Sequence, residues 1–162
     1  MHHRLIMHMR LNWSHMDMLR LSKKADYALI AVRHLATHPA ERSHSAADIA
    51  EMYGISAPLL AKILQRLAKH GLVTARHGSG GGYQLARDPK DISALEVVSA
   101  VDGPQMITAC ITSHGTCGQS VTCTVREPLR RVNDSILQVL RTITISQMSE
   151  DAPEVELIGL AG

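Results

Sequence analysis

Residues 45–71, SAADIAEMYGISAPLLAKILQRLAKHG, predict two helices joined by a tight turn. A capping-box pattern opens the first helix at Ser45, and Gly54 stands where a residue in the left-handed conformation would end it. Ser56 then caps a second helix that continues to His70. A helix, a glycine-containing turn and a second helix are the signature of a helix-turn-helix.

The second helix has one apolar face and one polar face. Its expected core positions are Leu59, Leu60, Ile63, Leu64 and Leu67. The opposite face carries Lys62, Gln65, Arg66 and Lys69, side chains that pair with phosphates and base edges in the major groove of DNA. Any helical hairpin shares the turn pattern, so it is this polar face that favours a DNA-recognition helix.

Residues 72–86 predict a β-hairpin around a glycine-rich turn. Such a loop could instead cradle a nucleotide phosphate, but that motif needs Lys and Ser or Thr after its last glycine, and here Tyr83 and Gln84 follow. Placed directly after a helix-turn-helix, the hairpin predicts the wing of a winged helix. Arg76 and His77 would then lie near its tip, beside a minor groove or the DNA backbone.

An earlier helix is predicted from Ser22, its N-cap, until Pro39 ends it. Its apolar face comprises Ala25, Ala28, Leu29, Val32, Leu35 and Ala36. Lys23 and Lys24 occupy the first turn, where the helix dipole favours acidic residues instead. They are candidates for contact with DNA phosphates, and the alternative is a solvated turn.

The composition indicates one compact domain, or a small domain with an oligomerisation element, in a chain of 162 residues. Phenylalanine is absent, so the core must be aliphatic, which favours helices. The net charge is only +2, yet residues 20–87 hold ten Lys or Arg against four Asp or Glu, as a polyanion-binding surface would. No apolar run is long enough to cross a membrane.

All three cysteines lie in one glycine-containing segment, at Cys110, Cys117 and Cys123. An odd count without a signal peptide argues against a disulfide framework and for a reducing compartment. Well-spaced thiolates with glycines between them suit an iron-sulfur cluster. Two alternatives stay open, namely zinc, with His114 completing a Cys3His set, and metal-free thiol redox chemistry.

The segments around the cysteines are predicted to be helical. Ser93 and Glu96 form a capping-box pattern for a helix that ends at Gly103. After the last cysteine, a heptad seam comprises Val125, Leu129, Val132, Ile136, Val139 and Ile143. This seam favours pairing with the same helix of a second subunit, and the alternative is a helix packed on its own domain.

The order of these parts resembles the IscR/NsrR-type winged-helix transcriptional regulators of bacteria, which carry an iron-sulfur cluster. The matching landmarks are Leu21-Ser22-Lys23, Asp26-Tyr27-Ala28, Gly54-Ile55-Ser56, Gly71-Leu72-Val73, Gly80-Gly81-Gly82-Tyr83 and the three cysteines ahead of a dimerisation helix. The resemblance spans residues 19–148. Within it, the cysteine spacing and residues 44–48, HSAAD, are most similar to the branch that regulates SUF cluster-assembly operons.

The resemblance implies a 2Fe-2S or 4Fe-4S cluster on the three cysteines. Three residues are candidates for the fourth ligand. His114 lies in the cysteine segment and Glu127 in the following helix, whereas NsrR-like members use an Asp from the first helix of the partner subunit, which corresponds to Asp26. Some members use a His three residues after the last cysteine, but here that position is Arg126.

The operator sequence cannot be transferred from IscR. That regulator has Ser, Gln and Arg for base contacts where this chain has Pro58, Lys62 and His77. The predicted DNA-contacting residues are Lys23, Lys24, Ser56, Pro58, Lys62, Gln65, Arg66, Lys69, Arg76 and His77.

These patterns together predict a mainly α fold, a winged helix-turn-helix with a β-hairpin wing, a cysteine loop and a long dimerisation helix. The expected organisation is a disordered extension (1–18), a DNA-binding domain (19–90), a cluster and dimerisation region (91–148) and a flexible tail (149–162). The expected function is that of a cytoplasmic homodimeric repressor, not an enzyme. It would bind double-stranded operator DNA and control cluster-assembly or stress-response genes. The alternative is a zinc- or thiol-based redox protein.

Overall fold

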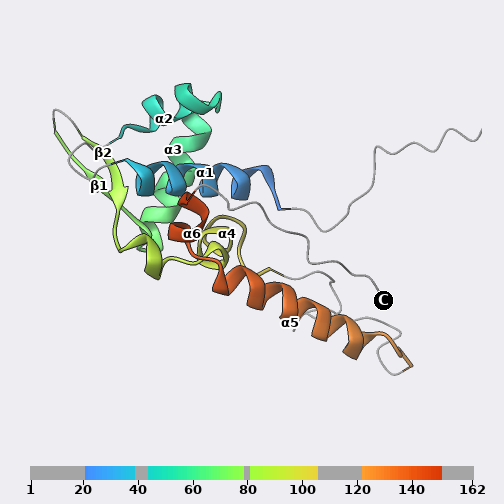
Figure 1. Cartoon of the computed structure of the whole chain (residues 1–162). Coiled ribbons are helices and arrows are strands. Elements are labelled where there is room, and N and C mark those ends of the chain that lie inside the picture. Colours follow the sequence, from blue (N-terminus) through green and yellow to red (C-terminus); the bar gives the residue numbers. More distant parts are fainter. Residues whose placement is uncertain (1–20, 39–43, 79–80, 106–121, 151–162) are drawn as a thin grey trace, which may run out of the picture.

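The computed structural model describes residues 21–38, 44–78, 81–105 and 122–150 (Figure 1). Its elements are α1 (Lys23–Thr37), α2 (Ala46–Tyr53), α3 (Ala57–Lys69), β1 (Val73–Arg76), β2 (Gly82–Leu85), the 3-10 turn η2 (Pro89–Asp91), α4 (Ala94–Asp102), α5 (Arg126–Thr142) and α6 (Ile145–Ser149). The predicted winged helix-turn-helix is confirmed. The predicted extension, residues 1–18, and residues 151–162 of the predicted tail lie outside the described residues.

The predicted helix starts are present as hydrogen-bonded caps. The Ser22 hydroxyl accepts from the Ala25 amide, and full capping boxes open α2 at Ser45 and α4 at Ser93. Gly54 has a φ of +64°, the left-handed conformation that ends α2. Ser56 occupies the cap position of α3 as predicted, but its side chain makes no capping hydrogen bond.

Helix α1 lies at the centre of the core, and α3, α4, α6 and β2 all contact it (Figure 1). Its inward face consists of small side chains, because Ala25, Ala28 and Ala31 are completely buried. Leu29 and Ala36, which the sequence assigned to this face, are only partly buried at its edge. Small residues let the neighbouring elements approach the α1 backbone closely. Four elements therefore pack around this helix, although the chain has no phenylalanine to fill larger gaps.

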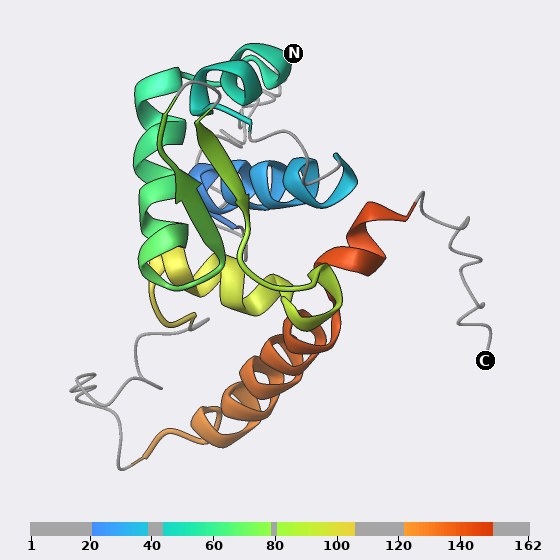
Figure 2. The same cartoon turned by 90° about the vertical axis from the view of Figure 1, so that its left-hand side faces the viewer.

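The wing is the two-stranded antiparallel sheet, in which Val73 pairs with Leu85 and Arg76 with Gly82. Strand β1 packs on α3 and β2 on α1, and Figure 2 shows the hairpin beside α3. A Cβ on Gly82 would lie 2.5 Å from the carbonyl oxygen of His44, closer than any side chain tolerates. Gly82 therefore lets residue 44 pair with β2, through two backbone hydrogen bonds to Tyr83.

Helix α5 projects away from the body of the molecule (Figure 1, orange), and the chain then returns to the core. The sequence did not predict α6, which packs on α1 with Ile145 completely buried. Arg33 Nε donates to the carbonyl of Met148 at 2.8 Å. Ile92, which precedes α4, and Ile145 belong to the same hydrophobic core as α1. This core therefore continues past residue 90, where the sequence placed the end of the DNA-binding domain.

Candidate nucleic-acid interface and cysteine segment

The outward face of α3 carries an exposed stripe of polar side chains. Pro58, Lys62, Gln65 and Lys69 follow one another in steps of four, three and four residues, so they share one side of the helix. The opposite side buries Leu60, Ile63, Leu64 and Leu67. A rigidly anchored helix therefore presents two Lys amines and one Gln amide to solvent, groups that bind phosphate and base edges.

Arg66 has a different environment from that stripe. Its Nη1 group donates a hydrogen bond of 2.6 Å to the backbone carbonyl of Val101, in the last turn of α4. The sequence interpretation grouped Arg66 with the base-reading residues because it is polar and falls beside Gln65. The structure instead directs one edge of its guanidinium group toward another helix of the same chain.

The other predicted DNA contacts lie on α1 and the wing. Lys23 and Lys24 are exposed in the first turn of α1, as are Arg76 and His77 where β1 leads into the turn of the hairpin. Ser56 at the start of α3 is exposed as well. All ten predicted contact residues are thus accessible, and they come from α1, α3 and the wing.

The cysteine segment is only partly described. Cys110, Cys117 and His114 lie outside the described residues, whereas Cys123 is a free, partly buried thiol shortly before α5. Within the described ranges, no group of three His, Cys, Asp or Glu side chains is arranged to hold a metal ion. Asp26 lies partly buried in the first turn of α1.

Glu127, a candidate ligand, is held in ion pairs at the start of α5. Its carboxylate accepts from Arg130 at 2.7 and 2.9 Å and from Arg131 at 3.4 Å. The hydrogen bond from Arg130 is the main cause that lowers the pKa of Glu127. Coordination by Glu127 would have to break these contacts.

The predicted heptad seam of α5 is left open to solvent. Val125, Val132 and Val139 are 55%, 49% and 56% exposed, and Leu129 and Ile136 are partly exposed. The one buried residue of this helix is Asn133. Helix α5 contacts α4 of its own chain, so it packs on its own domain in part and leaves the valines of the seam exposed.

A cluster of histidines lies where α1 meets α2 and the wing, and the sequence interpretation missed it. His34, 1% exposed, stacks on His38 at a ring-centre distance of 3.9 Å. Its Nε2 lies 3.3 Å from Nδ1 of His44, and its Nδ1 lies 3.2 Å from the Tyr53 hydroxyl. The one-turn spacing of His34 and His38 was the signal available in the sequence.

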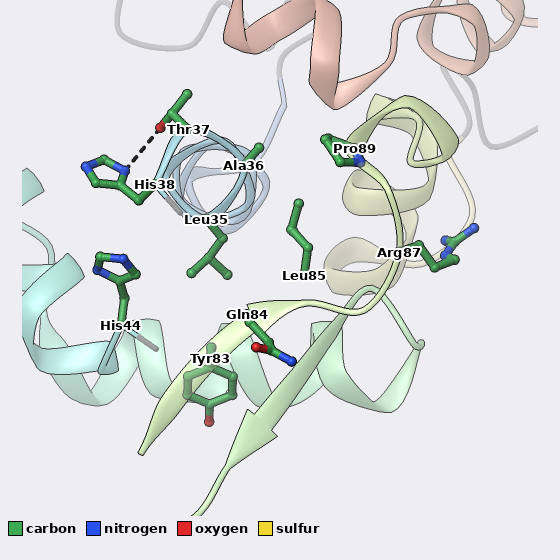
Figure 3. A pocket seen from close by; sticks show the side chains of 10 residues that line it. All are labelled: Leu35, Ala36, Thr37, His38, His44, Tyr83, Gln84, Leu85, Arg87 and Pro89. Atoms are coloured by element: carbon green, nitrogen blue, oxygen red, sulfur yellow. Dashed lines mark hydrogen bonds between the residues drawn. The ribbon is translucent and has the colours of Figure 1, made fainter. Parts of the chain in front are cut away.

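Beside this cluster, a pocket of about 470 Å³ opens between α1 and β2 (Figure 3). His38 and His44 line one side of it, and Leu85 points across it toward Ala36. The buried atoms His44 Nε2 and Gln84 Oε1 have no hydrogen-bond partner in the described structure.

None of the described helices is long and apolar enough to span a bilayer.

The chain is similar to known transcriptional regulators. The sequence profile of the Rrf2 family, described as an iron-dependent transcriptional regulator, matches residues 21–151. The chain is 33% identical over 141 residues to the HTH-type transcriptional regulator IscR of Photorhabdus laumondii, covering 87% of this chain and 85% of that protein. It is 36% identical over 130 residues to IscR of Xenorhabdus nematophila, covering 80% and 79%.

Solved structures share the fold. IscR of T. potens matches with a TM-score of 0.67 at 31% identity, covering 87% of this chain and 93% of that one. CymR (YrzC), the global cysteine regulator of B. subtilis, matches with a TM-score of 0.68 at 24% identity, covering 84% and 100%. At that lower identity the likeness concerns the fold alone.

The buried histidine predicts acid sensitivity of folding. Burial, and then the nearby His38 and His44, lower the pKa of His34 from 6.5 to about 4. Between those values the unfolded chain binds the proton and the folded chain does not, so stability falls as the pH drops below 6.5. The free energy of unfolding, measured by urea denaturation, should lose about 2 kcal/mol between pH 7.5 and pH 5 through this group.

His34→Gln should be less stable at pH 7.5 and should lose that part of the pH dependence. His70→Gln, which removes an exposed histidine at the end of α3, is the matched control and should keep the parent's pH profile. An unchanged pH profile in His34→Gln would contradict the assignment.

Proposed function

Since the chain belongs to the Rrf2 family and is a DNA-binding transcriptional regulator, we propose that an iron-sulfur cluster on Cys110, Cys117 and Cys123 controls its affinity for operator DNA. The observation that carries this proposal is the position of the cysteines. All three fall between α4 and α5 of a winged helix that is 31% identical to a solved IscR. The cluster would therefore sit at the junction between the DNA-binding elements and the projecting helix.

The DNA-binding surface combines reading and anchoring. Lys62 and Gln65 on the exposed stripe of α3 would read base edges in the major groove, and Lys69 would bind phosphate. Lys23 and Lys24 on α1, with Arg76 and His77 of the wing, would contact the backbone or a minor groove. Phosphate contacts fix the orientation of the protein, whereas base contacts select the sequence.

The donor set fits a cluster. Three cysteine thiolates separated by six and five residues suit the size of an iron-sulfur centre, and Cys123 is a free thiol. When bound, the cluster supplies a centre that responds to iron supply and to oxidation. For the fourth ligand we favour Asp26 of the partner subunit over His114 because of the resemblance to NsrR-like members, and over Glu127 because Arg130 and Arg131 engage that carboxylate. A carboxylate is a hard ligand on a thiolate-bound centre and is easier to displace.

The active form would be a homodimer. The exposed seam on α5 repeats at heptad spacing, and such a stripe is stable in water when it packs against a second copy. The exposed ion pairs of Arg130 with Glu127 and Asp134 keep charge beside the seam. A two-fold dimer would present two recognition helices to an inverted repeat.

The regulatory output would be repression of cluster-assembly or stress-response genes in the cytoplasm, where a bacterial regulator meets its operator. Loss or oxidation of the cluster would shift the population between two arrangements of the DNA-binding elements. A zinc- or thiol-based switch without a cluster is the competing outcome, and metal analysis distinguishes the two.

Base reading by α3 can be separated from phosphate binding. Gln65→Ala should weaken operator binding by roughly 1 to 3 kcal/mol and relax specificity at one base, because a base-edge contact is lost. Lys23→Ala should weaken operator and random DNA alike and reduce the salt dependence by about one counterion. Fluorescence anisotropy across a salt series measures both effects.

Lys90→Ala is the matched control, since Lys90 is an exposed lysine on η2, outside the three DNA-facing elements. It should bind as the parent does. Equal losses on operator and random DNA for Gln65→Ala would mean that α3 does not read bases through this residue.

The cluster prediction concerns protein purified without oxygen. It should be coloured and contain iron and acid-labile sulfide, and Ala at Cys110, Cys117 or Cys123 should remove both, since the thiolates anchor the irons. Asp26→Ala should alter the visible absorption spectrum, whereas Glu127→Ala should not. Colourless protein with one zinc per chain, under conditions that load a control cluster protein, would exclude the cluster.

The dimer prediction uses the exposed seam. Val132→Glu and Val139→Glu place a charge in the proposed interface and should convert the dimer to monomer in analytical ultracentrifugation, because burying an unpaired carboxylate is costly. Gln138→Glu introduces the same group at an exposed position off the seam and should leave the dimer intact. A parent protein that is monomeric at micromolar concentration would refute the α5 interface.

A further inference from the structure

We propose that Arg66 is a positioning residue that transmits the state of the cysteine segment to the recognition helix. The inference deepens the proposed function and rests on it. Arg66 belongs to α3, directly beside Gln65 of the exposed stripe, yet its Nη1 group donates to the carbonyl of Val101 in α4. One side chain thus joins the DNA-reading helix to the helix that leads into the cysteines.

The acceptor of this hydrogen bond lies at the end of α4. The last four carbonyls of a helix lack partners within the helix, and a cation near them also opposes the negative end of the helix dipole. Arg66 supplies both the donor and the charge to Val101, at 2.6 Å. Gly103 then ends α4 with a φ of +83°, and Cys110 follows seven residues later in the sequence.

A second contact ties the next residue of α4 to another DNA-facing element. The Ser22 hydroxyl donates to Asp102 Oδ1 at 2.8 Å while it accepts from the Ala25 amide as the cap of α1. Ser22 immediately precedes Lys23. Val101 therefore contacts α3, and the next residue, Asp102, contacts the cap of α1. Both residues lie close to where the chain enters the cysteine segment.

The other end of α4 is fixed. The Ala94 amide donates to the carbonyl of Ile143 at 2.8 Å, and the Ile145 amide donates to the carbonyl of Ile92 at 2.9 Å, so the start of α4 is joined to the chain that follows α5. Because the start of α4 is held in this way, a rearrangement of the cysteine segment that reaches α4 would act on its last turn. Arg66 and Ser22 are the side chains that carry such a displacement to α3 and α1.

The test measures the ratio of two operator dissociation constants, that of the cluster-free protein over that of the cluster-loaded protein. Operator dissociation constants are determined for cluster-loaded and cluster-free protein, for the parent and for Arg66→Ala. Coupling between two sites typically amounts to a factor of about 5 to 150. Arg66→Ala should reduce the ratio of the cluster-free to the cluster-loaded dissociation constant severalfold toward one, because one of the links between α4 and α3 is lost. A residue that only contacts DNA would weaken both forms by the same factor, so an unchanged ratio would overturn the proposal.

Two variants at Asp102 test the second contact, and a folding control accompanies all variants. Asp102→Ala removes the acceptor for Ser22 and should lower the ratio, whereas Asp102→Asn keeps an acceptor oxygen and should preserve it. Equal ratios for these two variants and the parent would overturn the Ser22 contact as part of the path. Circular dichroism and thermal melting of the cluster-free proteins identify any variant that fails to fold.

The result also separates this inference from the proposed function. A parent protein that holds no cluster, or that binds the operator equally with and without it, contradicts the proposed function itself. A parent with a large ratio that Arg66→Ala leaves intact contradicts only the positioning role.

Discussion

The close packing of α1 against its neighbours is the constraint on which the described structure depends. Three alanines on one face of this helix are completely buried, and α3, α4, α6 and β2 all meet around it. Because a tightly packed core responds to displacement as a unit, α3 cannot move far without α1 and α4. A larger side chain at the completely buried Ala28 would disturb the packing around α1.

This packing gives the DNA-binding elements rigidity, and the ends of α4 provide the connection to the remainder of the chain. The start of α4 is hydrogen-bonded to the segment after α5, and its end is held by Arg66 and Ser22. Helix α5 leaves the body with an exposed apolar stripe. A sensor between α4 and α5 in the sequence would thus follow the helix end that Arg66 and Ser22 contact and precede the proposed dimerisation helix.

Local signals explain what the sequence could predict. Ser45, Gly54 and Ser93 specify helix ends through contacts within a few residues, and the heptad seam of α5 is periodic, so these elements were predicted and are confirmed. The resemblance to IscR-type regulators is confirmed by relatives that are about a third identical over most of the chain. Helix α6 was missed because it has only five residues, too few for a periodic pattern.

Contacts between distant residues could not be predicted in this way. Arg66 and Val101 are 35 positions apart, so the sequence could not show that Arg66, which was predicted to contact DNA, donates a hydrogen bond to α4. His34 meets His44 and Tyr53 only because α1 packs beside α2 and the wing. The cysteines were proposed as cluster ligands from their spacing and the flanking sequence, but a further ligand would depend on tertiary and quaternary structure.

The most direct measurement is hydrogen-deuterium exchange on the same protein with its cluster loaded and removed. Exchange should change in the last turn of α4, in the first turn of α1 and in the second half of α3, while the interior of α1 stays unchanged. Changes confined to α5, with α1, α3 and α4 exchanging identically in both states, would contradict this expectation.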